Sequence, residues 1–189
     1  LSTIHATERG RNRGQLYDDM QRAINHTEWM LTYESWRIIC CSYFMAQEVR
    51  QYFDTPADKI DVIPNGIVTT QFDDLEDADL SSFRSRFATI SEKIVFYVGR
   101  LVYEKGLHVL IDSIPYVLAQ CPEAKFVIAG TGGMLESLQR QAESLGVSSR
   151  VCFTGFISDE DRNKLFKIAD CAVFPSLYEP FGIVALEAM

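Results

Sequence analysis

The second half of the chain alternates short apolar runs with longer stretches in which apolar residues recur at helical spacing. The short runs occupy residues 94–98, 126–129, 151–153 and 171–174. After the first run, for example, Leu107, Leu110 and Ile114 share one helical face. Strands that alternate with helices over such distances form βαβ units, whose strands lie parallel in one sheet. The alternation therefore predicts an α/β fold.

The first part of the chain shows the same order of elements over shorter lengths. We expect strands at 1–5, 37–42 and 59–63 and helices at 16–34 and 45–53. Pro64, Asn65 and Gly66 then form a turn. An acidic run poor in apolar residues follows, which we interpret as a solvated linker rather than a metal site: Asp73, Asp74, Glu76, Asp77 and Asp79. The expected domains are therefore 1–66 and 67–189.

Composition argues against several classes of protein. The chain has 189 residues and a net charge of −8, whereas a general nucleic-acid binder needs a basic surface. The longest apolar run, at 38–46, is far shorter than the ~20 residues of a membrane span, although peripheral membrane contact stays open. Leu1 falls inside an expected strand and Met189 inside an expected helix, so we expect the sequence to be a fragment.

The cysteines and histidines show no metal-ligand spacing. Most of the five cysteines lie in apolar, strand-like runs: Cys40, Cys41, Cys121, Cys152 and Cys171. We expect buried, reduced thiols, as in a cytoplasmic protein. His5, His26 and His108 are scattered along the chain, and His26 and His108, with Trp29, fit helix surfaces or packing. No metal site is expected.

Two glutamates, Glu179 and Glu187, flank a Pro-Phe-Gly turn directly after the last apolar run. This order predicts a strand, a loop and the start of a helix, and ligands of open α/β sheets bind at that edge. The helix N-terminus after Gly182 suits a phosphate, and the helical carboxylate suits a vicinal diol such as a ribose. Apolar neighbours suggest that Glu187 lies on a largely buried helix and needs a partner. The alternative is a chance pair of solvated glutamates.

Two other loops follow strands and should lie at the same edge of the sheet. The loop at 99–106 carries Arg100 and Lys105, cations that can bind a diphosphate, although an ordinary exposed loop would also contain them. The loop at 130–133, with Gly132, is similar to a phosphate loop but also fits a tight turn. Because all these loops converge on one crevice, we expect a site for a diphosphate and a diol.

The order of these motifs resembles that of the retaining GT-B glycosyltransferases, above all family 4 and the glycogen and starch synthases. The resemblance rests on Val62 to Gly66, on Gly99 to Gly106 and on Glu179 to Ala188, and it covers essentially the whole chain. It implies two Rossmann-like domains that face each other across a cleft, here part of the first and most of the second. The glycine-rich donor loop that the family carries near its N-terminus is missing from this sequence.

The resemblance also implies roles for individual residues. Arg100 and Lys105 would hold the donor diphosphate, and Glu187 the ribose hydroxyls. Glu179 would lie by the transferred sugar, and His5 would line the cleft. The remaining donor contacts would come from Gly132, Phe181, Gly182 and Ile183. Arg9, Arg11 and Arg13 fit a contact with donor phosphate or acceptor and fit a solvated loop equally well.

The implied activity is transfer of a hexosyl unit, glucosyl in the first instance, from a nucleotide diphosphate sugar to a saccharide or other hydroxyl acceptor, with retention. No cofactor or metal is required if the cations stabilise the leaving diphosphate. The alternatives are another GT-B enzyme, such as a nucleotide-sugar epimerase or a phosphorylase-like enzyme, and a non-catalytic nucleotide-sugar-binding module. The donor base, the acceptor, the oligomeric state and the role of Glu179 as nucleophile or electrostatic stabiliser stay open.

Overall fold

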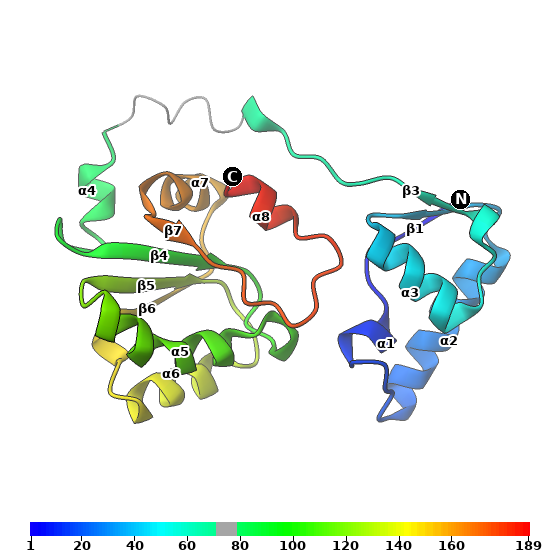
Figure 1. The fold of residues 1–189 in the computed structure, drawn as a ribbon, viewed down its shortest axis with the longest axis horizontal. Coiled ribbons are helices and arrows are strands. Elements are labelled where there is room, and N and C mark those ends of the chain that lie inside the picture. Colours follow the sequence, from blue (N-terminus) through cyan, green and yellow to red (C-terminus); the bar gives the residue numbers. More distant parts are fainter. Residues whose placement is uncertain (71–78) are drawn as a thin grey trace. The chain divides into compact units, whose positions relative to one another are not determined.

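The computed structural model describes residues 1–70 and 79–189, which form two compact units (Figure 1). Unit 1 comprises Leu1–Ile67 and Tyr178–Ile183, and unit 2 comprises Val68–Leu177 and Val184–Met189. The expected division at residue 66 assigned 178–183 to the second domain, whereas these residues pack within unit 1. Most of the acidic run, at 73, 74, 76 and 77, lies outside the described residues.

Unit 1 is built on a parallel sheet with the strand order β1-β2-β3. Its elements are β1 Ser2–Ile4, α1 Glu8–Arg11, α2 Asp19–Glu34, β2 Ile38–Cys40, α3 Tyr43–Phe53, η1 Ala57–Lys59 and β3 Ile60–Val62. In Figure 1, α2 and α3 lie on the same side of this sheet. Side chains that point to the covered face, those of Ile4, Ile38 and Cys40, are therefore buried, whereas Thr3 points to the other face and is exposed.

The core of unit 1 lies between the sheet and α3. Met45 and Val49 are fully buried against Ile38, and Ser42 caps the helix by accepting a hydrogen bond from the N–H of Met45 at 3.0 Å. The expected helix at 16–34 forms as α2, but the apolar residues along one side of it do not pack into a core. Met20, Ile24 and Leu31 are all exposed in the described structure.

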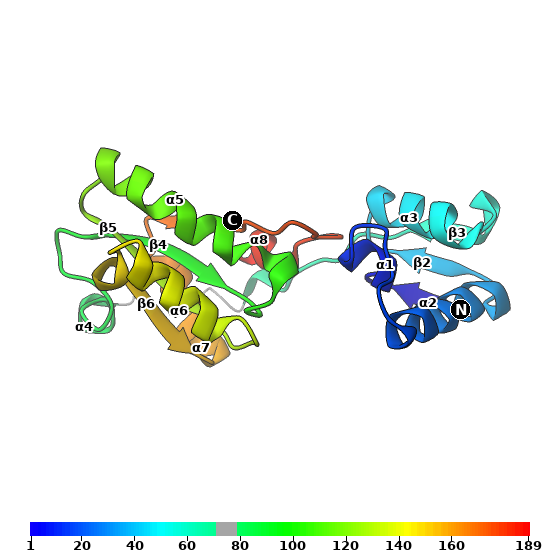
Figure 2. The same cartoon turned by 90° about the horizontal axis from the view of Figure 1, so that it is seen from below.

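Unit 2 is built on a second parallel sheet, with the strand order β6-β5-β4-β7 (Figure 1). Figure 2 shows β4, β5 and β6 of this sheet from below. Its elements are α4 Ser81–Arg84, β4 Lys93–Val98, η3 Tyr103–Lys105, α5 Leu107–Gln120, β5 Ala124–Ala129, α6 Leu135–Ser144, η4 Ser148–Arg150, β6 Val151–Gly155, α7 Asp159–Ile168, β7 Cys171–Ala172 and α8 Ile183–Glu187. The predicted alternation of strands and helices is confirmed, and so is the α/β class.

Helices cover both faces of the unit 2 sheet. Because successive residues of a strand point to opposite sides, each face contributes side chains to a separate core. Phe126 and Ile128 of β5 pack in one core with α5 and α6, whereas Val127 packs in another core with α4 and α7. Ser158 caps α7, since its Oγ accepts a hydrogen bond from the N–H of Asp161 at 3.1 Å. These packed layers place the ends of all four strands at one edge.

The end of unit 2 differs from the sequence expectation. The run at 171–174 gives only a short strand, Cys171–Ala172, and none of the residues of α8 is buried. The prediction of a largely buried helix around Glu187 therefore holds only in part: Ile183 is exposed and the other four residues of α8 are partly buried, because only one side of the helix packs against unit 2. Among the described helices, none combines the length and the apolar character required to cross a membrane.

Candidate functional site

The loops after β4 and β7 are in direct contact at the carboxyl edge of the unit 2 sheet. The N–H of Leu177 donates a hydrogen bond to the carbonyl of Glu104 at 2.8 Å. Gly106 adopts φ 69°, and any side chain there would overlap the carbonyl oxygen of Pro175. Only glycine meets both conditions, so Gly106 lets Lys105 and the start of α5 lie beside the loop that follows β7.

The glycine-rich loop after β5 is held against the loop after β4. The N–H of Leu101 donates to the carbonyl of Thr131 at 2.9 Å, and the N–H of Met134 donates to the carbonyl of Leu101 at 3.0 Å. A side chain at Gly132 would overlap the backbone of Leu101. The close approach of the two backbones therefore explains why position 132 requires glycine. The prediction of a donor contact by Gly132 stays a prediction.

A cavity of about 370 Å³ opens at this edge. It is formed by the ends of β4, β5 and β6 and the start of α7, and its lining includes Val98, Arg100, Phe156, Ile157, Asp159 and Arg162. Apolar side chains make one part of the wall and charged side chains another, as is usual in sites for small polar ligands. Phe156 and Ile157 were not predicted from the sequence, because a Phe-Ile pair after a strand also fits ordinary core packing.

The two predicted cations both lie in the loop after β4. Arg100 lines the cavity; its side chain is exposed, and its guanidinium lies 3.3 Å from Oε1 of Glu104. Lys105 ends the 3-10 helix η3, directly before Gly106, the residue at the N-cap of α5. Because glycine offers no capping side chain, the first N–H groups of α5 are not capped from that position.

Glu187 has the partner that its environment requires. Its carboxylate oxygen lies 3.7 Å from the guanidinium of Arg162, and the two side chains are only 14% and 19% exposed. Arg162 also contacts Asp159 at 2.8 Å and lines the cavity. Sequence reasoning missed Arg162. The signal was a cation in the acidic first turn of α7, where the helix dipole disfavours positive charge.

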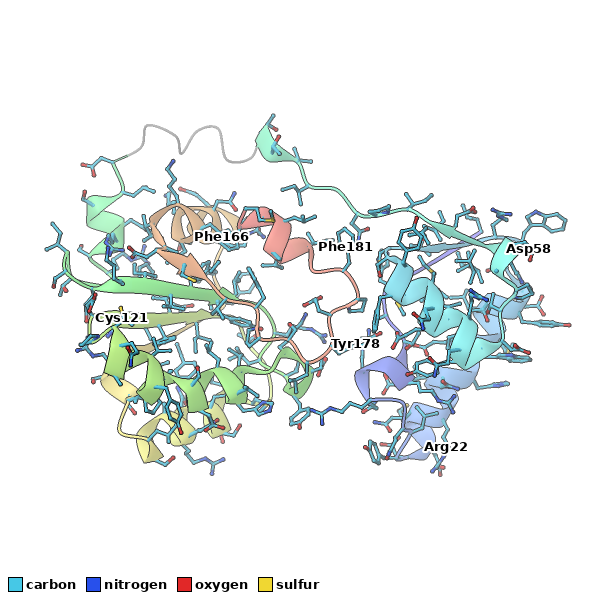
Figure 3. The ribbon with its side chains drawn as sticks, in the orientation of Figure 1. Arg22, Asp58, Cys121, Phe166, Tyr178 and Phe181 are labelled. Atoms are coloured by element: carbon cyan, nitrogen blue, oxygen red, sulfur yellow. The ribbon has the colours of Figure 1, made fainter. Side chains whose placement is uncertain are left out.

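The segment that carries Glu179 packs on unit 1 (Figure 3). The Tyr178 hydroxyl donates to Oε2 of Glu48 at 2.7 Å, and the Ser42 hydroxyl donates to the carbonyl of Pro180 at 2.6 Å. Phe181 packs against the apolar core of unit 1. Glu179 itself is exposed, and Gly182 turns the chain into α8 with φ 83°.

Glu48 is a buried carboxylate that sequence reasoning did not identify. It belongs to α3 and is only 7% exposed. Burial raises the pKa of the Glu48 carboxyl above its ordinary value, although the hydrogen bonds from Tyr178 and Thr7 lower it in part. Burial and the neighbouring carboxylate likewise raise the pKa of Tyr178. The signal was the spacing of Glu48 from Met45 and Val49, which puts it on the core-facing side of α3.

The remaining predicted residues of unit 1 lie near its sheet edge. His5 is exposed and directly follows β1. The arginines after it do not act as one group. Arg9 stacks over the Tyr52 ring at 5.3 Å, whereas Arg11 lies 3.6 Å from Glu8 and Arg13 takes a left-handed backbone conformation.

The thiols are only partly as expected. Cys40 and Cys41 are buried, and burial raises the pKa of Cys40 to about 11. Cys171 is exposed, so the expectation of a buried thiol is wrong there, because β7 lies at the edge of its sheet. Within residues 1–70 and 79–189, no three His, Cys, Asp or Glu side chains gather as a metal site.

The structure thus groups the predicted site residues in two sets. Unit 2 brings Arg100, Lys105, Gly132 and Glu187 to one sheet edge. Unit 1 carries His5 and the segment from Glu179 to Ile183. Parallel sheets with strand ends that present loops define both units as Rossmann-like, a class in which the loops bind the ligand.

Family models identify the chain. A model described as glycosyl transferases group 1 matches residues 82–189, and one described as glycosyltransferase family 4 matches residues 1–71. The chain therefore belongs to the family 4 glycosyltransferases of the GT-B fold.

Curated relatives match along the whole chain. An uncharacterised glycosyltransferase of Methanocaldococcus jannaschii is 44% identical over 191 residues, which are 100% of this chain and 48% of that protein. The glycogen synthase of Mycobacterium tuberculosis is 38% identical over 188 residues, which are 100% of this chain and 43% of the synthase. The chain thus spans about half the length of these relatives.

Solved structures share the fold. The crystal structure of Anabaena HepE in complex with UDP and glucose matches with a TM-score of 0.74 and 23% identity, over 98% of this chain and 49% of that one. WaaG, a glycosyltransferase involved in lipopolysaccharide biosynthesis, matches with a TM-score of 0.75 and 18% identity, over 98% and 52% of the two chains. At these identities the likeness bears on the fold alone, and it agrees with the expected GT-B architecture.

Proposed function

We propose that the intact protein transfers a hexosyl unit, glucosyl in the first instance, from a nucleotide diphosphate sugar to a saccharide or other hydroxyl acceptor. The anomeric configuration of the sugar is retained. The observation that carries the proposal is the cavity at the carboxyl edge of unit 2, with Arg100 and the Arg162–Glu187 pair around it. The glycogen synthase of M. tuberculosis and the UDP and glucose bound by HepE support this class of substrate.

The loop after β4 is suited to the diphosphate. Arg100 can bind two phosphate oxygens through its planar guanidinium, and Lys105 adds a compact point charge. The uncapped start of α5 after Gly106 supplies N–H groups and the positive end of a helix dipole. These groups stabilise the negative charge that develops on the leaving nucleoside diphosphate, so the chemistry requires no metal.

The nucleoside takes the other parts of this edge. Glu187 can accept hydrogen bonds from both ribose hydroxyls while Arg162 keeps its carboxylate paired. Val98, Phe156 and Ile157 offer apolar surface for the base in a cavity of about 370 Å³. Gly132 approaches the donor through its backbone.

The sugar-side roles belong to the residues of unit 1. Glu179 orients the transferred hexose and stabilises its oxocarbenium-like transition state, and His5 contacts the same sugar. The backbone of Phe181, Gly182 and Ile183 completes the donor contacts. Trapping a glycosyl-enzyme on Glu179 would assign it the role of nucleophile instead of electrostatic stabiliser.

Release of nucleoside diphosphate tests the proposal. With UDP-, ADP- or GDP-glucose, we expect the intact protein to release the nucleoside diphosphate faster when a saccharide acceptor is present. Lys105→Ala should reduce this turnover about 100-fold or more, because one of the two leaving-group cations is lost.

Other outcomes identify the alternatives. Product formation that is independent of the saccharide would indicate an epimerase, and a need for inorganic phosphate would indicate a phosphorylase-like reaction. Tight donor binding without any release would indicate a binding module. Wild-type kcat in the Lys105→Ala variant would contradict the role of Lys105.

A further inference from the structure

Unit 1 contains a closed hydrogen-bond network around the carboxylate of Glu48. Oε2 of Glu48 accepts hydrogen bonds from the Tyr178 hydroxyl at 2.7 Å and from the Thr7 hydroxyl at 3.2 Å. The Tyr178 oxygen in turn accepts a hydrogen bond from the backbone N–H of Thr7 at 3.3 Å. Each of the three residues therefore contacts the other two, although they belong to distant parts of the sequence.

The short helix α1 is shaped to admit this network. Thr7 caps α1, because its hydroxyl oxygen accepts a hydrogen bond from the N–H of Gly10 at 2.9 Å. A side chain at Gly10 would meet the Tyr178 hydroxyl at 2.6 Å and Oε2 of Glu48 at 2.7 Å. Both distances are too short for a carbon atom, so Gly10 gives the carboxylate the room to reach α1.

Stability alone is a poor reason for such a network. A buried carboxylate loses its hydration, and the hydrogen bonds that replace it offset this loss only in part. An apolar side chain at position 48 would fill the space at lower cost, next to the core residues Met45 and Val49. What the network provides instead is one defined geometry for the groups that it joins.

The groups that it joins are the neighbours of two proposed site residues. Thr7 lies two positions after His5, and Tyr178 directly precedes Glu179. The bond to Tyr178 is reinforced on the same segment by the hydrogen bond between Ser42 and Pro180 and by the packing of Phe181. Glu48 therefore contacts both the segment after β1, through Thr7, and the segment before α8, through Tyr178.

We propose that Glu48 is a positioning residue, which holds the His5 segment and the Glu179 segment in the one arrangement that sugar transfer requires. The inference rests on the proposed function. Glu48 touches neither donor nor acceptor, and it acts through Thr7 and Tyr178. Loss of the network should therefore displace the catalytic groups without weakening the contacts that unit 2 makes with the nucleotide.

The test uses Glu48→Gln, Tyr178→Phe and the double variant in the intact protein. We expect kcat to fall about 10-fold or more in each single variant, because displacements on the order of 1 Å reduce rates strongly. The KM for the donor should rise by a smaller factor than the one by which kcat falls, because the contacts of unit 2 with the nucleotide are kept. The double variant should lose little more than the worse single variant, since both remove the same interaction.

Matched exposed residues serve as controls. Tyr43→Phe and Glu34→Gln make the same chemical changes on α3 and α2, where both side chains are exposed, and should leave kcat unchanged. Thermal unfolding of every variant establishes that it is folded. Tyr178→Phe keeps the ring that packs near Phe44, with ring centroids 6.2 Å apart, and therefore tests the network if Glu48→Gln fails to fold.

The outcomes separate this inference from the proposed function. Folded variants with wild-type kcat would overturn the positioning role and leave the transferase proposal intact. If KM rose by the same factor by which kcat fell, and the losses of the two single variants added up in the double variant, the effect would be a general structural one. That result would also overturn the positioning role. If the wild-type protein releases no nucleoside diphosphate from any donor, the proposed function is wrong and the positioning role with it.

Discussion

At the scale of single residues, Arg162 links the candidate donor cavity to Glu187. It lies between Asp159, at 2.8 Å, and Glu187, at 3.7 Å, and it also faces the cavity. The Glu187 side chain is only 14% exposed, so without Arg162 its carboxylate would be enclosed without the charge that now pairs with it. A partner of this kind fixes the orientation of the carboxylate, whose oxygens can then accept hydrogen bonds from two hydroxyl groups.

Arg162→Gln should therefore weaken binding of the free nucleoside diphosphate about 10-fold, because Glu187 loses the charge that orients it. Calorimetric titration of the intact protein measures this directly. Arg140→Gln, an exposed change on α6, serves as the control and should bind as the wild type does. Unchanged or tighter binding in Arg162→Gln would mean that Arg162 does not support Glu187.

Among the elements, the junction of α7 and β7 depends on one aspartate. Asp170 accepts hydrogen bonds from the N–H of Ile94 at 2.9 Å and from Lys93 at 3.0 Å, and it lies 3.6 Å from Arg84. Burial alone would raise the pKa of Asp170, but the N–H of Ile94 and the two cations lower it below its ordinary value. Asp170 thereby joins β4, α4 and the start of β7.

Asp170→Asn should lower the free energy of unfolding by about 1 kcal/mol at pH 7, discounted because the carboxylate is partly exposed. Since the folded-state pKa is depressed, this stabilisation is present above the unfolded pKa of about 4 and is lost as the pH falls through the folded value. Denaturant unfolding at pH 7, 5 and 3 measures the difference, with Glu143→Gln as an exposed control. A difference that persists unchanged at pH 3 would contradict the electrostatic explanation.

For the whole molecule, local patterns predicted most of the fold. A pattern that lies within one element predicts that element whatever packs against it. The helical spacing of Leu107, Leu110 and Ile114 is such a pattern, and so are the apolar runs of the neighbouring strands. The parallel sheets and the edge that carries Arg100 and Lys105 follow from these local signals and from the topology of βαβ units. The surface position of the apolar residues of α2 and the incomplete burial of α8 did not follow, because burial depends on what packs against an element.

Contacts between distant parts of the sequence could not be predicted. Tyr178 and Glu48 are 130 positions apart, and no periodicity relates them. Glu187 was expected to need a partner, but the choice of Arg162 depends on how α7 and α8 pack within unit 2. The same holds for 178–183, which the sequence assigned to the second domain and which packs with unit 1.

If the proposed function is right, a nucleotide diphosphate sugar binds at the carboxyl edge of unit 2 through Arg100 and Lys105. Calorimetric titration of the intact protein with UDP-, ADP- and GDP-glucose tests it most directly, with the wild type and the Arg100→Ala/Lys105→Ala double variant side by side. We expect one donor to bind the wild type and the double variant to bind it about 100-fold more weakly, because two charge-assisted contacts to phosphate are lost. Equal affinity of the two proteins for that donor, or binding of none of the three by the wild type, would contradict it.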